Sequence, residues 1–137
     1  MSFVKVMWME HSEPGDNSDI EIQEPSIAQI EEAIAGMNGF SCSYVMLFPS
    51  DETSEIYLAI AGGTQGYYFV SHWDGVAGVE IELANPRETS QDYVDVELGQ
   101  ISRRKACQLV DRDTAQRVAR IFAETGKLAA ELPWKQA

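Results

Sequence analysis

Short stretches in which apolar and polar residues alternate dominate the first two thirds of the chain. Such stretches are typical of β-strands, because successive side chains of a strand point to opposite faces of a sheet. We expect strands at residues 3–9, 43–48, 55–61, 67–73, 78–83 and 93–98. The turns between most of them are short, and Asp74-Gly75 is a typical hairpin sequence. This arrangement predicts antiparallel pairing, since parallel strands need long crossover connections.

Residues 26–39 carry the first of two helix patterns. Ser26 and Gln29 have the spacing of a capping box, in which each side chain bonds the backbone N–H of the other residue. Four apolar residues follow at intervals of three and four and form one stripe: Ile27, Ile30, Ile34 and Met37. We expect Asn38-Gly39 to end this helix, because glycine readily adopts the left-handed conformation of helix C-termini.

The second helix is expected over residues 112–125. Asp111 precedes it as the N-cap, and Gly126 follows it as the stop signal. One face of this helix is apolar and consists of Ala115, Val118, Ala119 and Phe122. Residues 103–110 suit either one more strand or an extended connector. The segment Leu132-Pro133-Trp134 is expected to pack back onto the sheet.

Residues 10–24 are polar and acidic and contain the turn sequence Pro14-Gly15, so that either a loop or a meander fits them. The length of 137 residues and the hydrophobic fraction of 45% suit one globular domain over residues 1–137. Together the elements predict an α+β fold. Its antiparallel β-meander sheet has about five to seven strands, and two α-helices pack on one face of it.

Charge is distributed unevenly along the chain. Residues 1–98 hold 18 acidic residues and two basic ones, whereas residues 99–137 hold four acidic and eight basic residues. The first block is unsuited to direct nucleic-acid binding, which depends on Lys and Arg neutralising phosphates. An acidic surface attracts a basic partner and accelerates association, but it also simply keeps a protein soluble. Charge alone leaves both interpretations open.

The compartment follows from what the sequence lacks. No apolar run approaches the roughly 20 residues of a membrane-spanning helix, and residues 1–9 lack the pattern of a secretory signal. We therefore expect a cytoplasmic protein without membrane contact, and the sequence leaves its oligomeric state open. Cys42 and Cys107 lie far apart in the sequence, and we expect free, largely buried thiols.

The common catalytic and metal sites are not indicated. His72 with Cys42 or Cys107 would make a nucleophile–base pair, but neither cysteine has the context of a nucleophile elbow or a cysteine protease. The isolated histidines and cysteines lack zinc-site spacing, and residues 16–19 match a calcium loop only in part. Residues 62–66 lead into a strand, whereas a phosphate-binding loop leads into a helix. We expect no enzyme activity, no metal and no cofactor.

Carboxylates alternate with apolar residues in two of the expected strands. Glu80 and Glu82 share one face of the first strand, and Tyr93, Asp95 and Glu97 share one face of the second. If these strands pair, four carboxylates and a tyrosine crowd one face of the sheet, although like charges placed opposite each other are destabilising. A surface for a basic partner would explain such a cluster. A solvated face with offset strands is the alternative.

The C-terminal segment, residues 117–134, has a characteristic order of features. A helix runs into a Phe-x-x-Thr-Gly sequence that starts at Phe122, a short linker follows, and the segment closes on Leu132-Pro133-Trp134. In these features the chain resembles the Imm-one family of immunity proteins from bacterial polymorphic toxin systems. Before this segment the resemblance is architectural. Many members of the family carry an acid after the final Trp, where this chain has Lys135.

The resemblance implies a bacterial protein encoded with a secreted toxin, often a nucleic-acid deaminase or nuclease, which it binds and neutralises. The partner would be the C-terminal domain of that toxin, whose basic cleft an acidic face would occupy. The resemblance also implies structural roles for Phe122, Gly126 and Trp134.

Strand alternation, and not the family, predicts the residues that contact the partner. They are Asp74, Glu80, Glu82, Tyr93, Asp95 and Glu97. Two other functions remain open. The chain would also suit an acidic adaptor or assembly subunit without a toxin partner, or a small enzyme that uses Glu80, Glu82 or Asp95 as general acid or base.

Overall fold

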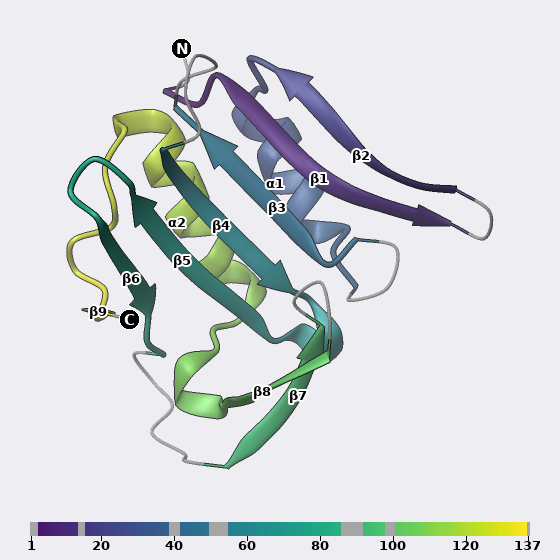
Figure 1. The fold of residues 1–137 in the computed structure, drawn as a ribbon, viewed down its shortest axis with the longest axis vertical. Helices are drawn as coiled ribbons and strands as arrows, with labels where there is room; N and C mark the ends of the chain where they lie inside the picture. The colour runs from purple at the N-terminus through teal and green to yellow at the C-terminus, as the bar shows by residue number, and fades with distance from the viewer. Residues whose placement is uncertain are drawn as a thin grey trace.

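The chain folds into an antiparallel sheet with two covering helices and a separate β-ribbon (Figure 1). A computed structural model describes residues 3–13, 16–38, 42–49, 55–85, 92–97 and 101–136. The strands of the main sheet are β1 (Val6–Glu13), β2 (Asp16–Gln23), β3 (Tyr44–Phe48), β4 (Ile56–Gly62), β5 (Tyr68–Asp74), β6 (Val79–Leu83) and β9 (Trp134–Gln136). Their order is β2-β1-β3-β4-β5-β6-β9. The ribbon consists of β7 (Tyr93–Glu97) and β8 (Ile101–Lys105).

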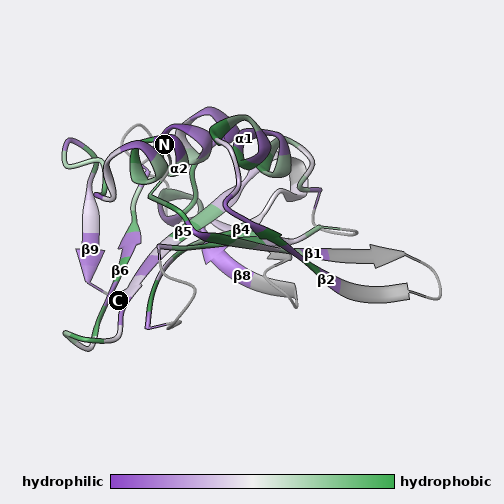
Figure 2. Ribbon diagram, turned by 90° about the horizontal axis from the view of Figure 1, so that it is seen from above, coloured by the Kyte–Doolittle hydropathy of each residue, from purple (hydrophilic) through white to green (hydrophobic). Residues whose placement is uncertain are grey.

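Both α-helices cover the same face of the sheet (Figure 2). They are α1 (Ile27–Ala35) and α2 (Arg112–Thr125), and the side-chain amide of Gln116 joins them by donating to the carbonyl of Glu31 at 2.9 Å. The expected α+β fold with an antiparallel sheet and two helices is therefore confirmed. Within the described ranges, no helix combines the length and the apolar composition needed to cross a bilayer.

Helix α1 begins as expected and ends earlier. Ser26 Oγ accepts the backbone N–H of Gln29 at 3.1 Å, and Gln29 Oε1 accepts that of Ser26 at 2.8 Å, so the capping box is confirmed. The expected end at Asn38-Gly39 is wrong, because the N–H of Met37 bonds the Ile34 carbonyl at 3.1 Å and tightens the last turn. Met37 still reaches the core beyond this turn.

Helix α2 spans the expected residues. Asp111 Oδ1 accepts the backbone N–H of Thr114 at 2.8 Å at its N-terminus. Gly126 ends the helix in the left-handed conformation, with φ of 73°, and its N–H bonds the Phe122 carbonyl at 2.8 Å. Both terminal signals in the sequence are thus confirmed, and Phe122 has its expected place in the core.

The core lies between the helices and the sheet. One row of side chains in register crosses five strands on this face: Met7, Leu47, Leu58, His72 and Ile81. Ile30 and Ile34 from α1 and Val118 and Phe122 from α2 cover it, and each of these four is at most 2% exposed. The side chains that alternate with this row along each strand therefore point to the opposite face of the sheet.

Residues 10–13 and 16–23 pair as two strands and do not form a loop. β1 extends to Glu13 and pairs with β2 along its whole length, from Val6 opposite Gln23 to Glu13 opposite Asp16. The first strand therefore covers residues 6–13 and not 3–9, and of the two alternatives for this segment the meander is correct. The acidic segment forms a strand because its isoleucines, Ile20 and Ile22, alternate with polar residues that face the other side.

Two short connectors meet at the start of β5. Residues 62–66 form a hairpin loop with one 3₁₀ turn, η1 (Thr64–Gly66), as expected from their position before a strand. Residues 103–110 combine both alternatives for that segment, because β8 ends at Lys105 and the turn η2 (Ala106–Gln108) follows. The last residue of the segment, Val110, then exchanges backbone hydrogen bonds with Tyr68 at 2.8 and 2.9 Å.

Strands β6 and β7, the two acidic strands, do not pair with each other. β6 lies between β5 and β9, and β7 pairs with β8 in the separate ribbon. β9 takes the edge of β6 because Trp134 packs back onto the core, as expected for this segment. β7 instead faces a strand that carries three consecutive basic residues, Arg103, Arg104 and Lys105.

Basic residues from the C-terminal third lie against acidic residues from the rest of the chain. Asp95 is opposite Arg103 in the ribbon, and Glu82 is opposite Lys135 in the sheet. Arg120 of α2 has its Nη1 atom 4.0 Å from a carboxylate oxygen of α1. The uneven charge of the sequence thus becomes a set of opposite-charge neighbours in the fold.

Candidate protein-binding surface

The sheet face opposite the helices, the open face, carries a cluster of aromatic side chains. Trp8, Phe48, Tyr57 and Trp73 come from four adjacent strands and make up what we call the aromatic row. The Phe48 ring centroid lies 5.6 Å from that of Trp8 and 5.7 Å from that of Tyr57, and Tyr57 is opposite Trp73 in register. Phe48 is buried beneath its neighbours, whereas Trp8 is 40% exposed. Partly exposed aromatic side chains of this kind are enriched in protein interfaces.

The exposed end of the aromatic row is fixed in orientation by a carboxylate. Trp8 Nε1 donates a hydrogen bond of 2.7 Å to Glu21 Oε1, across the β1–β2 pair. The second carboxylate oxygen, Glu21 Oε2, accepts from Gln23 Nε2 at 3.1 Å. These bonds hold the indole ring on the surface, so that a partner would meet a rigid aromatic side chain with an acid beside it.

Two further acids on this face are tied to the start of β3. Glu10 accepts hydrogen bonds from the backbone N–H of Ser43 at 3.0 Å and from its hydroxyl at 2.8 Å. Asp19 accepts the hydroxyl hydrogen of Tyr44 at 2.5 Å. Burial, followed by this bond to Asp19, raises the pKa of Tyr44 to about 12. Tyr44 therefore stays protonated and acts as the donor of this hydrogen bond.

Of the residues expected to contact a partner, Glu80 and Glu82 lie on the open face. Their register neighbours on β5 are Trp73 and Ser71, and Lys135 of β9 is opposite Glu82. Glu80 is exposed and lies directly beside the aromatic row. The two glutamates thus flank the row on the side opposite to Glu21.

The ribbon borders the open face at its other end. The Arg104 guanidinium carbon lies 4.6 Å from the ring centroid of Phe69, a residue on the same side of β5 as Trp73. Val94 from β7 and Leu109 pack against the same ring. Figure 2 shows β8 on the side of the sheet that faces away from the helices. The ribbon therefore places basic and apolar side chains against Phe69, on the open face but at the far end of β5 from Trp73.

The expected cluster of four carboxylates and a tyrosine is not formed, because β6 and β7 belong to different sheets. Tyr93 is 62% exposed on the ribbon, opposite Lys105. The backbone positions of Asp95 and Glu97 are also on the ribbon, and their side chains lie outside the described part of the structure. With Arg103 opposite Asp95, the crowding of like charges that motivated the cluster does not arise.

Asp74 serves a turn. Its Oδ1 atom accepts the backbone N–H groups of Val76 and Ala77, both at 3.1 Å, and so closes the β5–β6 hairpin. Its strand position alternates away from the open face, on the side of His72. These bonds explain why the position holds an acid, and no protein partner is needed to explain it. The geometry gives no support to the expectation that Asp74 contacts a partner.

His72 and the cysteines occupy structural environments. The His72 ring packs at 5.9 Å and 70° against Phe122 under α2, and burial lowers its pKa, with the charge of Asp74 acting in the opposite direction. Neither cysteine forms a disulfide, as expected; Cys42 is buried and Cys107 half-buried. Burial, and then the charge of Glu10, raises the pKa of the Cys42 thiol, which contacts the Tyr44 carbonyl at 3.7 Å. Such a thiol is a poor nucleophile.

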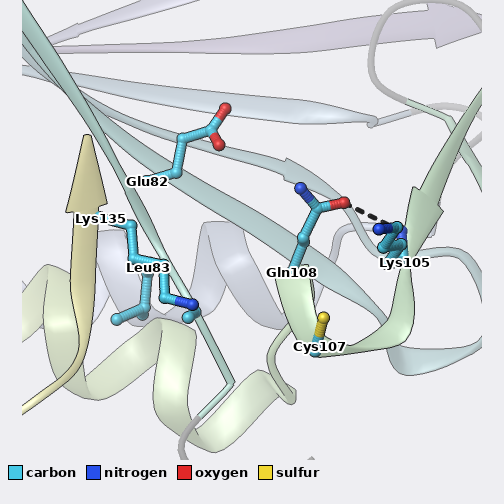
Figure 3. A pocket seen from close by; sticks show the side chains of 7 residues that line it. Glu82, Leu83, Lys105, Cys107, Gln108 and Lys135 are labelled. Carbon is cyan, nitrogen blue, oxygen red and sulfur yellow. Dashed lines mark hydrogen bonds between the residues drawn. The ribbon is translucent and has the colours of Figure 1, made fainter. Parts of the chain in front are cut away.

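A hollow of about 240 Å³ lies between β6, β9 and η2 (Figure 3). Glu82 lines one side of it, and Cys107 and Gln108 line the other. Gln108 Oε1 accepts the backbone N–H of Lys105 at 3.0 Å and so is used to hold the turn. Among the described residues, no group of three or more His, Cys, Asp or Glu side chains is arranged to hold a metal ion.

The sequence interpretation missed the aromatic row and the acid that orients it. Nothing in the sequence around Trp8 shows that this residue belongs to a surface shared by four strands. The signal in the sequence that points to the aromatic row is the alternation of Tyr57 and Trp73 with the core residues of their strands, which places both rings on the face opposite the core. Comparison with known protein families, with curated proteins and with solved structures finds no match to this chain.

Proposed function

We propose that this protein is a binding protein without catalytic function, which captures a basic protein partner on its open face. The observation that carries the proposal is the aromatic row with its exposed, hydrogen-bonded Trp8 and with acids on both sides. Aromatic anchors contribute much of the binding energy of interfaces, and surrounding charges select the partner and accelerate its capture. Glu21 on one side and Glu80 and Glu82 on the other favour a partner that presents Lys or Arg.

The partner, in this proposal, is the C-terminal domain of a cognate bacterial toxin. The support for this identity is the resemblance of residues 117–134 to the Imm-one immunity family. A toxin that acts on nucleic acid needs a basic substrate cleft, which complements the acids of the open face. Neutralisation would be steric and stoichiometric, would take place in the cytoplasm of the producing cell, and would require no cofactor.

An acidic adaptor would use the same surface for a different basic protein. The two functions differ in the partner and not in the geometry, so that identification of the partner separates them. Affinity capture of the tagged chain from its native host, with toxin expression verified, is the direct experiment. A toxin domain recovered at one-to-one stoichiometry supports immunity. A different basic protein supports the adaptor, and the absence of any partner contradicts both.

A variant series then tests the surface. Because the structure separates the expected acids onto two sheets, we would neutralise them as two pairs, E80Q with E82Q and D95N with E97Q. The matched control pair, E124Q with E131Q, removes the same charge from residues on α2 and in the loop after it. We expect Trp8→Ala to weaken binding by about tenfold or more, the loss typical of an interface anchor. The pair at β6 should slow association in a manner that added salt reduces.

The control pair should leave affinity and association rate unchanged. Melting temperatures of all variants separate lost contacts from lost folding. Full affinity for the toxin in both Trp8→Ala and the β6 pair would show that the partner binds elsewhere, even if the immunity function itself is correct.

A further inference from the structure

Strand β2 is a long edge of the sheet. It has eight residues, Asp16–Gln23, and in the described structure it pairs with β1 alone. Figure 1 shows β2 as the rim of the sheet on the side away from β9. Every second backbone N–H and C=O group of such a strand points away from the sheet and is able to pair with another strand.

The two edges of the sheet differ in a way that singles out β2. The opposite edge, β9, has three residues and carries Lys135 at its centre. Short strands and lysines are common means by which proteins protect an edge from pairing. β2 is more than twice as long and contains no basic residue and no proline. Among the described residues, negative charge is what protects this edge, and it repels acidic segments and attracts basic ones.

The side chains of β2 differ between its two faces. On the open face lie Asp19 and Glu21, both exposed, and on the helix face lie Ile20, which is 37% exposed, and Ile22. Beside Ile22, a hollow of about 260 Å³ opens between the hairpin and α1. It is lined by Met7, Met9, Ile22, Gln29, Glu32 and Ala33. An added strand would therefore meet carboxylates on one face and, on the other, a largely apolar hollow that also contains Gln29 and Glu32.

We propose that the outer edge of β2 receives an extended basic segment of the partner protein, which adds a strand to the sheet. Charge complementarity identifies the occupant. Residues of the segment that point to the open face would be Lys or Arg, opposite Asp19 and Glu21, and the alternate residues would be apolar, opposite Ile20 and Ile22. A second copy of this chain is disfavoured, because pairing β2 with β2 would bring acids opposite acids.

The inference rests on the proposed function for the statement that the segment belongs to the captured partner. The edge itself is testable without a toxin. The probe is a synthetic peptide of eight residues with alternating Lys and Val, blocked at both ends, titrated into the isotope-labelled full chain and followed by NMR. A peptide with four Lys followed by four Val has the same charge and composition and is the matched control.

We expect saturable shifts of the backbone amides of β2 with the alternating peptide, and weaker, diffuse shifts with the block peptide. Neutralising both acids, D19N with E21Q, should weaken the alternating peptide about tenfold, since two cross-strand charge pairs are lost. The control pair E124Q with E131Q removes the same net charge from α2 and the loop after it, and should leave the affinity for the alternating peptide almost unchanged.

Two proline variants test for backbone pairing. Successive residues of an edge strand direct their N–H groups alternately to the neighbouring strand and to solvent. Of Ile20→Pro and Glu21→Pro, therefore, one should lower the melting temperature strongly and the other should leave it almost unchanged. The stable variant should no longer bind the peptide. If this variant is Glu21→Pro, Glu21→Gln controls for the loss of the glutamate side chain.

Several results would overturn the inference. They are equal binding of both peptides, no saturable shift in residues 16–23, retained binding in the stable proline variant, or a dimer in which β2 is protected from hydrogen exchange. Toxin capture that survives the stable proline variant would also remove the edge from the mechanism, and the proposed function would stand. If the peptide binds at β2 but no toxin partner is found, the inference about the edge stands and the proposed function fails.

Discussion

Replacing Trp134 with Ala tests whether the C-terminal strand β9 holds the sheet together. The Trp134 side chain is half-buried against the core, its Nε1 donates a 3.0 Å hydrogen bond to the Ala129 carbonyl, and its backbone pairs with Leu83. The neighbouring Pro133 carbonyl accepts the N–H of Ala84 at 2.9 Å. Truncation at Trp134 therefore removes both a packed ring and a side-chain bond at the place where β9 meets β6.

The magnitude follows from these two contributions. Truncation of a fully buried aromatic residue costs about 3–5 kcal/mol, and a half-buried ring should contribute about half of that. A half-buried hydrogen bond adds about 1 kcal/mol. We expect Trp134→Ala to lower the free energy of unfolding by about 3 kcal/mol. Trp134→Phe keeps most of the apolar area and should lower it by about 1 kcal/mol.

Urea unfolding at 25 °C, followed by circular dichroism, measures both changes. Hydrogen exchange should show faster opening of the β6 amides in Trp134→Ala, because the outer edge of β6 loses its partner. If both variants lie within about 0.5 kcal/mol of the wild type, β9 does not contribute as argued.

Three further predictions concern the core and the ends of α2. Burial lowers the pKa of His72, so between this pKa and the unfolded value near 6.5 the unfolded chain binds a proton that the folded protein does not. The free energy of unfolding should therefore fall as pH decreases below about 7, by at most about 1.4 kcal/mol per pH unit, and His72→Leu should remove this part of the slope in urea titrations. Asp111→Ala removes the N-cap bond to Thr114 and should lower the free energy of unfolding by about 1 kcal/mol, whereas Asp111→Ser should retain most of it. Gly126→Ala forces a left-handed alanine whose Cβ lies 3.2 Å from Phe3 Cδ1; a loss of about 1–2 kcal/mol by thermal unfolding is expected, and no loss would show that the C-terminus of the helix readjusts.

Local signals in the sequence predicted the helices and most strands. Asp111 and Gly126 define α2 because capping involves neighbouring residues only, and the alternating segments of the central strands reflect one buried face. The acidic hairpin was harder, because β2 lies at an edge and buries little apolar surface. Its two isoleucines are a weak signal within a polar segment.

Pairing between distant strands was not predictable in the same way. Nothing local indicates that Glu82 faces Lys135 or that Asp95 faces Arg103, since register depends on which edges are free after the core has formed. The prediction of an acidic cluster was wrong because it assumed that β6 and β7 pair with each other. The aromatic row also depends on four strands in a particular order, and Trp8 meets Phe48 only because β1 and β3 are neighbours.

The opposite-charge neighbours in the fold also have a consequence for the chain before it folds. Residues 1–98 hold 16 more acidic than basic residues and residues 99–137 only four more basic than acidic ones, so repulsion within the first part outweighs attraction between the two parts. We expect the denatured ensemble to be expanded at low ionic strength, with the basic last part reducing this expansion only in part. Added salt shortens the range of these forces from about 30 Å at 0.01 M to about 3 Å at 1 M, and should let the denatured chain contract and lower the urea m-value. Guanidinium chloride is itself a salt and measures the contracted ensemble from the start, so the two denaturants should give different accounts of the same folded protein.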